Sequence, residues 1–503
     1  MGEINRLRVK SPYELMKIVD IKIENKPNEH GYLYLKCLID DTINFQSTIK
    51  ASTEDEICVY EELEDIDNKN KSTSNDENTI NINEVNERNS KRLFNGIVQN
   101  IRTININGIY YLEIQALTSS FKLDIKEKSR SFQNVDMTYD ALINEILKDY
   151  SGYTFTQNIG KGQKIDKPLF QYKETDWNFF KRIASELKSE LYCDIINLNY
   201  MFNFGIPSEY SYKLNDNMNY GAFKNLKRFH EAGGDEVYHD TDYFYYELKM
   251  RTILEIGSKI YFKQKELYVR EYEAYRNKEE IIYKYKLCRK NGVWQTKLYN
   301  SLLNGASVDG KVLAVKEELV KIHLDIDENQ SEEEAFWFRY APPSANIMYV
   351  MPLVGENVRL YFPSEGNEEP IVTGCVRKNG DTCGQTSDTT SRYFQTEHGS
   401  EIALFPGALN IKGGSKEPLS INFDDETGVT LTSPTGLNLN AGGEIVIKTR
   451  NNINISAQSQ ILMTKGNTEN GVSIEGEFHI KGNNVIKNGS CRETYAPFAE
   501  GGV

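Results

Sequence analysis

Side chains that could carry out chemistry are present in this chain, but none has the spacing of a known catalytic motif. The histidines form no His-Glu-x-x-His motif and no pair at the spacing of zinc ligands, so the sequence does not support a zinc hydrolase. It also has no Gly-x-Ser-x-Gly turn and no phosphate-binding loop. Glu368 and Glu369 are adjacent and would face opposite sides of a strand, unlike a pair of glycosidase carboxylates. The six histidines are His30, His230, His239, His323, His398 and His479.

The cysteines are scattered along the chain, odd in number and without a Cys-x-x-Cys pair. This pattern predicts reduced, mostly buried thiols rather than a disulfide framework or a zinc site. The seven cysteines are Cys37, Cys58, Cys193, Cys288, Cys375, Cys383 and Cys491.

A strongly acidic stretch lies between residues 54 and 87, where twelve acidic residues accompany two lysines. Little in this stretch could pack against a core, so we expect residues 65–90 to form a solvated, mobile loop. The stretch lacks the Asp-x-Asp-x-Asp-Gly spacing of a calcium loop. We therefore expect no catalytic residue, no cofactor and no metal ion, and we expect that the protein is not an enzyme.

Charge and hydropathy argue against two further classes of protein. The formal net charge of -14 leaves no broad basic face that could neutralise the phosphates of a nucleic acid. The sequence has no N-terminal signal peptide and no apolar run approaching about 18 residues. We expect synthesis in the cytoplasm without a membrane span, and any later exit through other machinery.

A repeat of eight residues near the C-terminus is the strongest pattern in the sequence. Two apolar residues separated by one other residue recur six times at this interval, and we call each unit an octad. Such a pair places two side chains on one face of a strand, and Gly, Asn and Ser between the pairs are typical of a β-solenoid. The pairs are Ile421/Phe423, Val429/Leu431, Leu437/Leu439, Ile445/Ile447, Ile453/Ile455 and Ile461/Met463.

The number of octads favours three chains over one. A single chain needs roughly three sides per turn, so its octads would give about two turns, fewer than the roughly three repeats that a stable solenoid needs. Three identical chains would instead stack one octad from each chain in every layer, with all apolar pairs facing a shared axis. We therefore predict a homotrimeric, intertwined β-helix with these twelve residues as its core. An ordinary antiparallel sheet is the alternative.

The rest of the chain predicts a mainly β protein with a small α/β part. Strand patterns dominate residues 1–125 and 236–305, which we assign to a first and a second barrel-like hub region. Residues 126–235 are expected to form an α/β segment with two short helices, whose N-caps are Thr138 and Thr175.

The part of the chain that follows, residues 306–378, shows no helical pattern longer than a turn. Residues 306–378 contain about five short strand patterns separated by Gly and Pro turns, which suits a small barrel like the oligonucleotide/oligosaccharide-binding (OB) fold. Residues 379–391 are a polar linker. Residues 392–503 are assigned to the β-helical spike and its tip.

Several stretches resemble VgrG-type proteins, the central spikes of type VI secretion systems, and the hub and spike proteins of contractile phage tails and phage-tail-like bacteriocins. "RLFNGIVQNI" and "YKETDWNFFKRIASELK" resemble segments of the family's hub, and "VMPLVGENVRLYFPSEGNEEPIVTGCV" is similar to its small barrel. "FQTEHGSEIALFPG" is similar to the start of its spike, although the family more often has Gly before His where this chain has His398 before Gly399. The resemblance touches nearly the whole chain in the expected order.

This resemblance implies a structural hub and membrane-piercing central spike of a contractile injection system. Such a hub would adapt a threefold spike to a sixfold tube, and contraction of the sheath would drive the spike into the target envelope. The implied partners are two further copies of the chain, inner-tube and baseplate proteins, a PAAR-type tip protein and the target cell envelope. The alternative is a trimeric β-helical tail spike that binds or cleaves surface polysaccharide.

The tip of the spike and the type of machine stay open at this point. The lone His479 could hold a metal ion through three symmetry-related copies, but a separate PAAR-type cap, or a cap formed by the residues after Ile480, would also close the tip. Phage tails, bacteriocin-like particles and secretion systems share these parts. The compact spike without an effector favours a phage-tail-like particle.

Overall fold

The chain divides into two compact units, Met1–Gly380 and Asp381–Val503. Most of the predicted acidic loop at 65–90, and the tip beyond residue 482, lie outside the described residues. No helix in the described part of the chain is long and apolar enough to cross a membrane. The computed structural model describes residues 6–43, 45–62, 90–197, 199–207, 210–231, 239–278, 280–293, 296–342, 350–364, 369–376, 383–414, 419–466 and 470–482.

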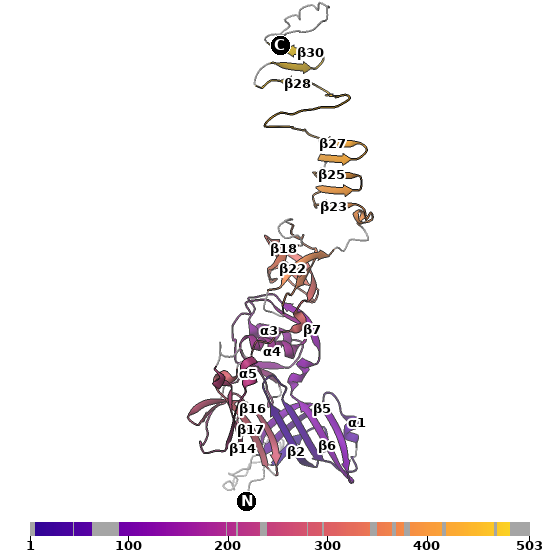
Figure 1. Cartoon of the computed structure of the whole chain (residues 1–503). Coiled ribbons are helices and arrows are strands. Elements are labelled where there is room, and N and C mark those ends of the chain that lie inside the picture. The colour runs from indigo at the N-terminus through magenta and orange to yellow at the C-terminus, as the bar shows by residue number, and fades with distance from the viewer. Residues whose placement is uncertain are drawn as a thin grey trace, which may run out of the picture. The chain divides into compact units, whose positions relative to one another are not determined.

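A 12-stranded sheet is the largest element of the first unit (Figure 1). Its strand order is β1-β4-β5-β6-β3-β2-β16-β17-β14-β13, and β15 pairs with both β16 and β12. The strands are β1 (Arg6–Lys10), β2 (Lys17–Asn25), β3 (Tyr32–Leu38), β4 (Glu56–Glu62), β5 (Ser90–Ile106), β6 (Ile109–Leu117), β12 (Ser211–Lys213), β13 (Tyr220–Lys224), β14 (Phe244–Met250), β15 (Lys259–Phe262), β16 (Lys265–Asn277) and β17 (Glu280–Cys288).

The two predicted hub regions contribute strands to this one sheet. Strand β2 pairs antiparallel with β16, and Lys22 lies opposite Tyr275. Within each strand the apolar residues alternate, so that Ile21 and Ile23 of β2 and Leu33 of β3 face the core. The division at residues 125 and 236 stays a prediction, and the structure adds that the two regions are joined by backbone hydrogen bonds.

The α/β segment contains the two predicted helices, α3 (Tyr139–Leu147) and α4 (Asp176–Glu186). Both predicted N-caps are confirmed: the Thr138 side chain accepts a hydrogen bond from the Ala141 amide, and Thr175 accepts one from the Asn178 amide. Shorter helical segments are α1 (Gln46–Lys50), η1 (Ser119–Asp124), α5 (Leu226–Glu231), η3 (Asp240–Tyr243), η4 (Lys290–Val293), η5 (Ser301–Leu303) and η7 (Gly384–Thr386).

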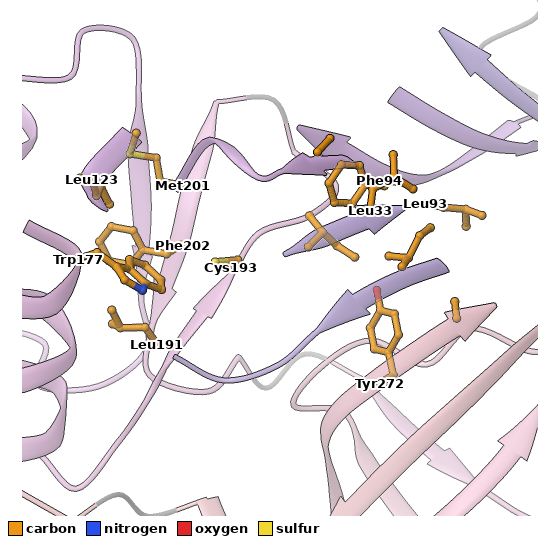
Figure 2. Close-up of a cluster of buried hydrophobic side chains, with 14 of the residues drawn as sticks. Leu33, Leu93, Phe94, Leu123, Trp177, Leu191, Cys193, Met201, Phe202 and Tyr272 are labelled. Atoms are coloured by element: carbon orange, nitrogen blue, oxygen red, sulfur yellow. The ribbon is translucent and has the colours of Figure 1, made fainter. Parts of the chain in front are cut away.

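Two small sheets accompany these helices. Strands β10 (Leu191–Cys193), β11 (Tyr200–Phe204) and β8 (Thr154–Gln157) form one, and β7 (Glu127–Phe132) pairs with β9 (Leu169–Thr175) in the other. Their apolar side chains merge with those of the large sheet into one core. Figure 2 shows this continuity, with Trp177 and Phe202 gathered at one end, Leu33 and Phe94 at the other, and Cys193 between them.

A closed five-stranded barrel follows, in the order β18-β19-β20-β22-β21. Its core packs against the preceding segment, where the ring of Phe170 meets that of Phe362 edge-on at a centroid distance of 4.9 Å. The Ser131 hydroxyl also donates a hydrogen bond to Asp327, with 2.6 Å between the oxygens. The OB-like barrel predicted from the sequence is confirmed. Its strands are β18 (Ser307–Lys316), β19 (Leu319–Leu324), β20 (Phe338–Ala341), β21 (Asn357–Tyr361) and β22 (Ile371–Val376).

The second unit consists of antiparallel hairpins on either side of a segment without strands (Figure 1). Five strands form the first sheet: β23 (Arg392–Gln395), β24 (Glu401–Phe405), β25 (Ala408–Gly413), β26 (Leu419–Asp424) and β27 (Gly428–Thr432). Three strands form the second: β28 (Ile461–Thr464), β29 (Gly471–Ile474) and β30 (Phe478–Lys481).

Candidate interaction surface of the C-terminal unit

The twelve predicted core residues are not buried within the single chain. Ile421 and Ile461 are partly buried, and the other ten are exposed, with the largest exposed fraction, 67 %, at Ile447. Among the described residues of this unit, Ala403 is the one apolar residue that is buried. The ten exposed residues are Phe423, Val429, Leu431, Leu437, Leu439, Ile445, Ile447, Ile453, Ile455 and Met463.

The sequence predicted a core shared by three chains and none within a single chain, and within the single chain these residues form no core. Leu439 is an example. It is 61 % exposed, because the residues beside it along the chain do not cover it. The assignment of the twelve residues to a trimer core shared by three chains stays a prediction. Their exposure leaves a large apolar surface that the single chain does not cover.

Residues 433–460 carry the three central octads and form no strand. Bends occur at 434–435, 442–443, 450–451 and 458–459, so they recur every eight residues, in phase with the apolar pairs. No backbone–backbone hydrogen bond joins this segment to itself or to other described residues. The amide and carbonyl of Gly436 bond to the Ser433 side chain, and the amide of Asn451 bonds to the Thr449 hydroxyl. The other backbone groups of this repeat of arm and bend have no backbone partner among the described residues and could pair with another chain.

The first two octads lie in the hairpin sheet that precedes this segment. Ile421 lies opposite Leu431, and Phe423 lies opposite Val429. Each pair continues a cross-strand ladder that begins further upstream, and paired residues in an antiparallel sheet share one face. The first ladder runs Phe394, Ile402, Ile411, Ile421, Leu431, and the second runs Leu404, Leu409, Phe423, Val429.

The last octad begins a second set of ladders. Ile461 lies opposite Ile474, which lies opposite Phe478, while Met463 is followed in the same way by Val472 and Ile480. The sequence reasoning missed the ladder residues outside the octads. Their apolar-x-apolar spacing was visible, but the turns between their strands differ in length and break the period of eight.

The described residues contain no group of three or more His, Cys, Asp or Glu side chains that could hold a metal ion. His479 lies on β30, where its Nε2 atom is 3.9 Å from a carboxylate oxygen of Glu477. The prediction of reduced thiols is confirmed for the five cysteines whose side chains are described, and four of these are buried. The Cys375 side chain and Cys491 lie outside the described part of the chain.

One buried polar cluster of the first unit was not foreseen from the sequence. His30, in the turn between β2 and β3, contacts the Ser120 hydroxyl through Nδ1 at 2.9 Å and a carboxylate oxygen of Asp124 through Nε2 at 3.3 Å. Ser120 in turn lies 3.0 Å from the Cys193 sulfur. Burial opposes the charged imidazole, but contacts with Asp124 and Cys193 outweigh it and raise the pKa of His30. The Cys193 thiol is buried, so the cluster fixes the turn against η1 and β10.

A second buried cluster surrounds Glu190, which precedes β10. Its carboxylate accepts hydrogen bonds from Arg228 of α5 at 2.8 Å and from Arg270 of β16 at 2.9 Å. Arg270 also donates a hydrogen bond to Glu271 at 3.0 Å. Burial raises the pKa of the Glu190 carboxyl, and the charge of Arg270 opposes that rise. The cluster connects a helix and two sheets through charged side chains that are at most 16 % exposed.

The geometry of barrel, hub sheet and apolar ladders can be compared with known proteins. Residues 308–376 match the family model of the type VI secretion system/phage-baseplate injector OB domain. Comparison with curated proteins gave no significant match. Among solved structures, a type VI secretion component of E. coli, c3393, aligns over 74 % of this chain and 100 % of its own, with 12 % identity and a TM-score of 0.50.

This chain has the fold of the VgrG-type spike proteins. A chain of the lidded Francisella PdpA-VgrG complex supports the same conclusion, because it aligns over 86 % of this chain and 81 % of its own length, with 11 % identity and a TM-score of 0.55. The E. coli protein is itself described as structurally similar to the T4 bacteriophage tail proteins gp27 and gp5. At these identities the likeness concerns the VgrG-type fold, and it agrees with the family expected from the sequence motifs.

Proposed function

We propose that the chain is the hub and central spike of a contractile injection system. In this proposal the first unit is the hub, and the second unit winds together with two further copies into an intertwined β-helix. The observation that carries the proposal is the segment 433–460. It has exposed apolar pairs, no backbone–backbone hydrogen bonds to described residues, and bends that recur at the same interval as the pairs. The injector OB domain and the VgrG-type fold support the assignment to this class of machine.

Assembly of three copies would both pair the backbone of residues 433–460 and bury its apolar side chains. Each extended arm would pair its backbone with the arms of the other chains, and each octad would direct two apolar side chains, such as Leu437 and Leu439, toward a common axis. Full burial of a side chain the size of Ile or Leu stabilises a structure by about 1.5–3 kcal/mol. Shared pairing also leaves few strand edges from which the spike could be peeled apart.

The proposed action is mechanical and requires no catalytic residue. The hub would cap the inner tube within the baseplate and adapt its sixfold symmetry to a threefold spike. Sheath contraction would then push the spike into the envelope of a target cell, outside the cell that made the particle. A PAAR-type protein would be a suitable partner for the tip.

Light scattering on the purified full chain tests this proposal. We expect a mass three times the 57.8 kDa of one chain, and resistance of the second unit to protease at concentrations where the trimer persists. A folded monomer whose residues 433–460 resist protease would contradict the proposal, because the octads would then be covered within one chain. A single-chain solenoid for surface polysaccharide would be the better description in that case.

A further inference from the structure

One end of the large sheet carries a group of exposed apolar side chains. Strands β5 and β16 both end there, because each neighbouring pair from β5 through β6, β3 and β2 to β16 is antiparallel. The tips of the hairpins β5–β6 and β16–β17 therefore lie at the same end of the sheet, which we call the tip end. Ile106 and Ile109 flank the first tip and are both about half exposed. Met16, just before β2, is 62 % exposed, and its amide donates to the Leu38 carbonyl at the end of β3.

A β-bulge at the start of β2 adds Val19 to this surface. In the register of β2 with β3, Ile18 lies opposite Cys37. Asp20 lies opposite the adjacent residue, Lys36, so Val19 is the extra residue of the bulge. A bulge changes the direction of its extra side chain, and Val19 is 43 % exposed. The tip end thus exposes apolar side chains from several strands, and such surfaces mark sites of protein–protein contact.

Residues of both hairpin tips line a groove of about 540 Å³ at this end. Its apolar wall includes Ile18, Val19 and Ile109. Arg276, near the end of β16, fixes the second tip against β2, because its guanidinium donates to the Ile18 carbonyl and, at 2.8 Å, to the Lys278 carbonyl. Contacts within the chain therefore hold the groove in shape.

The charged side chains that line the groove are cationic. Lys17, Arg276 and Lys278 contribute to its wall, and none of its described lining residues is Asp or Glu. The side-chain amines of Lys17 and Lys278 form no hydrogen bond or ion pair with a described residue. This is a local exception in a chain with a formal net charge of -14. A partner that places carboxylates beside apolar side chains would complement both the charge and the apolar wall.

The tip end lies at the opposite end of the hub strands from the barrel. At the other end, the turn between β2 and β3 packs against η1, with the His30 Nδ1 atom 2.9 Å from the Ser120 hydroxyl. The Thr175 hydroxyl at the end of β9 donates to Asp124 of η1, and Phe170 of β9 packs against the barrel. In the proposed machine the spike follows the barrel and the inner tube stands behind the hub. The tip end is therefore on the side of the hub that would meet the tube.

We propose that the tip end is the docking surface for the inner tube, and that its groove receives a segment of the tube protein in which carboxylates flank apolar side chains. Lys17 and Lys278 pair with the carboxylates, while Val19, Ile106 and Ile109 cover the apolar side chains. This inference rests on the proposed function and adds to it the surface and the chemistry of the contact.

Binding of the full-length trimer to purified rings of the inner-tube protein from the same particle, followed by biolayer interferometry, tests the surface. The double variant Lys17→Glu/Lys278→Glu should weaken binding at least about tenfold, because like charges across an interface repel each other. Val19→Asp should weaken it about tenfold as well. Raising the salt from about 0.1 M to 1 M should weaken binding of the parent more than binding of the double variant, because salt screens exposed ion pairs.

Lys161→Glu and Ile125→Asp are the matched controls. Both residues are exposed in the first unit, and neither lines the groove. Each control should bind the rings as the parent does. All of these substitutions alter exposed side chains, so we expect the variants to fold, and near-UV circular dichroism checks this. If Val19→Asp does not fold, the double charge variant carries the test.

Light scattering separates the failure of this inference from the failure of the proposed function. A parent trimer that does not bind the rings, or that binds them equally well after the groove substitutions, would overturn the docking surface and leave the hub and spike assignment standing. Loss of the trimer mass in the groove variants would also overturn it, because the tip end would then be an interface between copies of this chain. A monomeric parent would contradict the proposed function itself, together with the inference that rests on it.

Discussion

The two units of this chain differ in where their large apolar side chains lie: they are mostly buried in the first unit and mostly exposed in the second. In the first unit Leu33, Phe94 and Trp177 are at most 1 % exposed, and they belong to one core built from segments far apart in the sequence. In the second unit the side chains with the same chemistry stand in solvent, as Ile447 and Ile455 show. The first unit therefore has a large apolar core within one chain, whereas the octad side chains of the second unit are left uncovered by the single chain.

This difference predicts two kinds of stability. The stability of the hub core depends on contacts within one chain, so it should not change with protein concentration. In the proposed trimer the spike would gain its core through association, so its stability would include a term that depends on the concentration of chains. Variants in the first unit test the stability that depends on one chain, and variants in the second unit test the stability that depends on association.

The largest effect is expected for Ile447→Asp, which would place three carboxylates at the proposed axis. Loss of three apolar side chains and burial of three like charges should destabilise the trimer by at least about 10 kcal/mol. Light scattering should then give the mass of one chain, 57.8 kDa, with the hub still folded by near-UV circular dichroism.

Lys448→Asp is the control for this variant, since Lys448 neighbours Ile447 and would face away from the axis. Its trimer mass should be unchanged. A trimer that survives Ile447→Asp would show that this octad is not at the interface, and the comparison between the units would lose its basis.

A smaller effect is expected within the hub for Glu190→Gln. The change leaves Arg228 and Arg270 without their shared carboxylate, and breaking a buried ion pair costs about 3–5 kcal/mol. The thermal unfolding midpoint of the first unit should fall while the mass of the assembly stays the same. Glu231→Gln serves as the control, because Glu231 is an exposed residue of α5 that pairs with Lys227 at 3.7 Å, and its loss should have little effect.

The smallest effect concerns pH. Because the pKa of His30 is raised in the folded protein, its stabilising contact with Asp124 is complete below the ordinary pKa of about 6.5 and is lost as the pH rises through the folded-state value. The difference in unfolding free energy between the parent and His30→Gln should therefore be larger at pH 5.5 than at pH 8.5, by about 1 kcal/mol. Denaturant unfolding followed by tryptophan fluorescence measures it, since the Trp177 ring lies 4.7 Å from the His30 ring, centroid to centroid, with the two planes tilted by 37°. If the difference between the parent and His30→Gln is the same at both pH values, His30 is not the titrating group.

Local features of this fold could be predicted from the sequence, and long-range ones could not. The caps at Thr138 and Thr175 depend on a few neighbouring residues, and the barrel and the octads each occupy one continuous stretch. The pairing of Lys22 with Tyr275 and the contact of His30 with Asp124 join distant segments, and nothing in the local pattern of either residue specifies its partner.

For the apolar ladders of the second unit, too, a repeat within one stretch could be predicted from the sequence, whereas the pairing between strands could not. Its octads could be predicted because equal spacing makes a period visible. The ladder through Ile402 and Ile411 has the same chemistry but unequal turns, so it became evident from the strand register alone. The groove at the tip end combines residues from several elements, and no single motif marks it.

The bends that recur every eight residues make the length of the spike adjustable in fixed steps. Removing residues 441–448, which carry one bend and one apolar pair, would rejoin equivalent positions and shorten each proposed three-chain needle by one layer, about 4.8 Å. Removing four residues would instead turn the arms beyond the cut away from the axis. Needles of graded reach could thus arise from one hub by gain or loss of whole octads, without any change at the base.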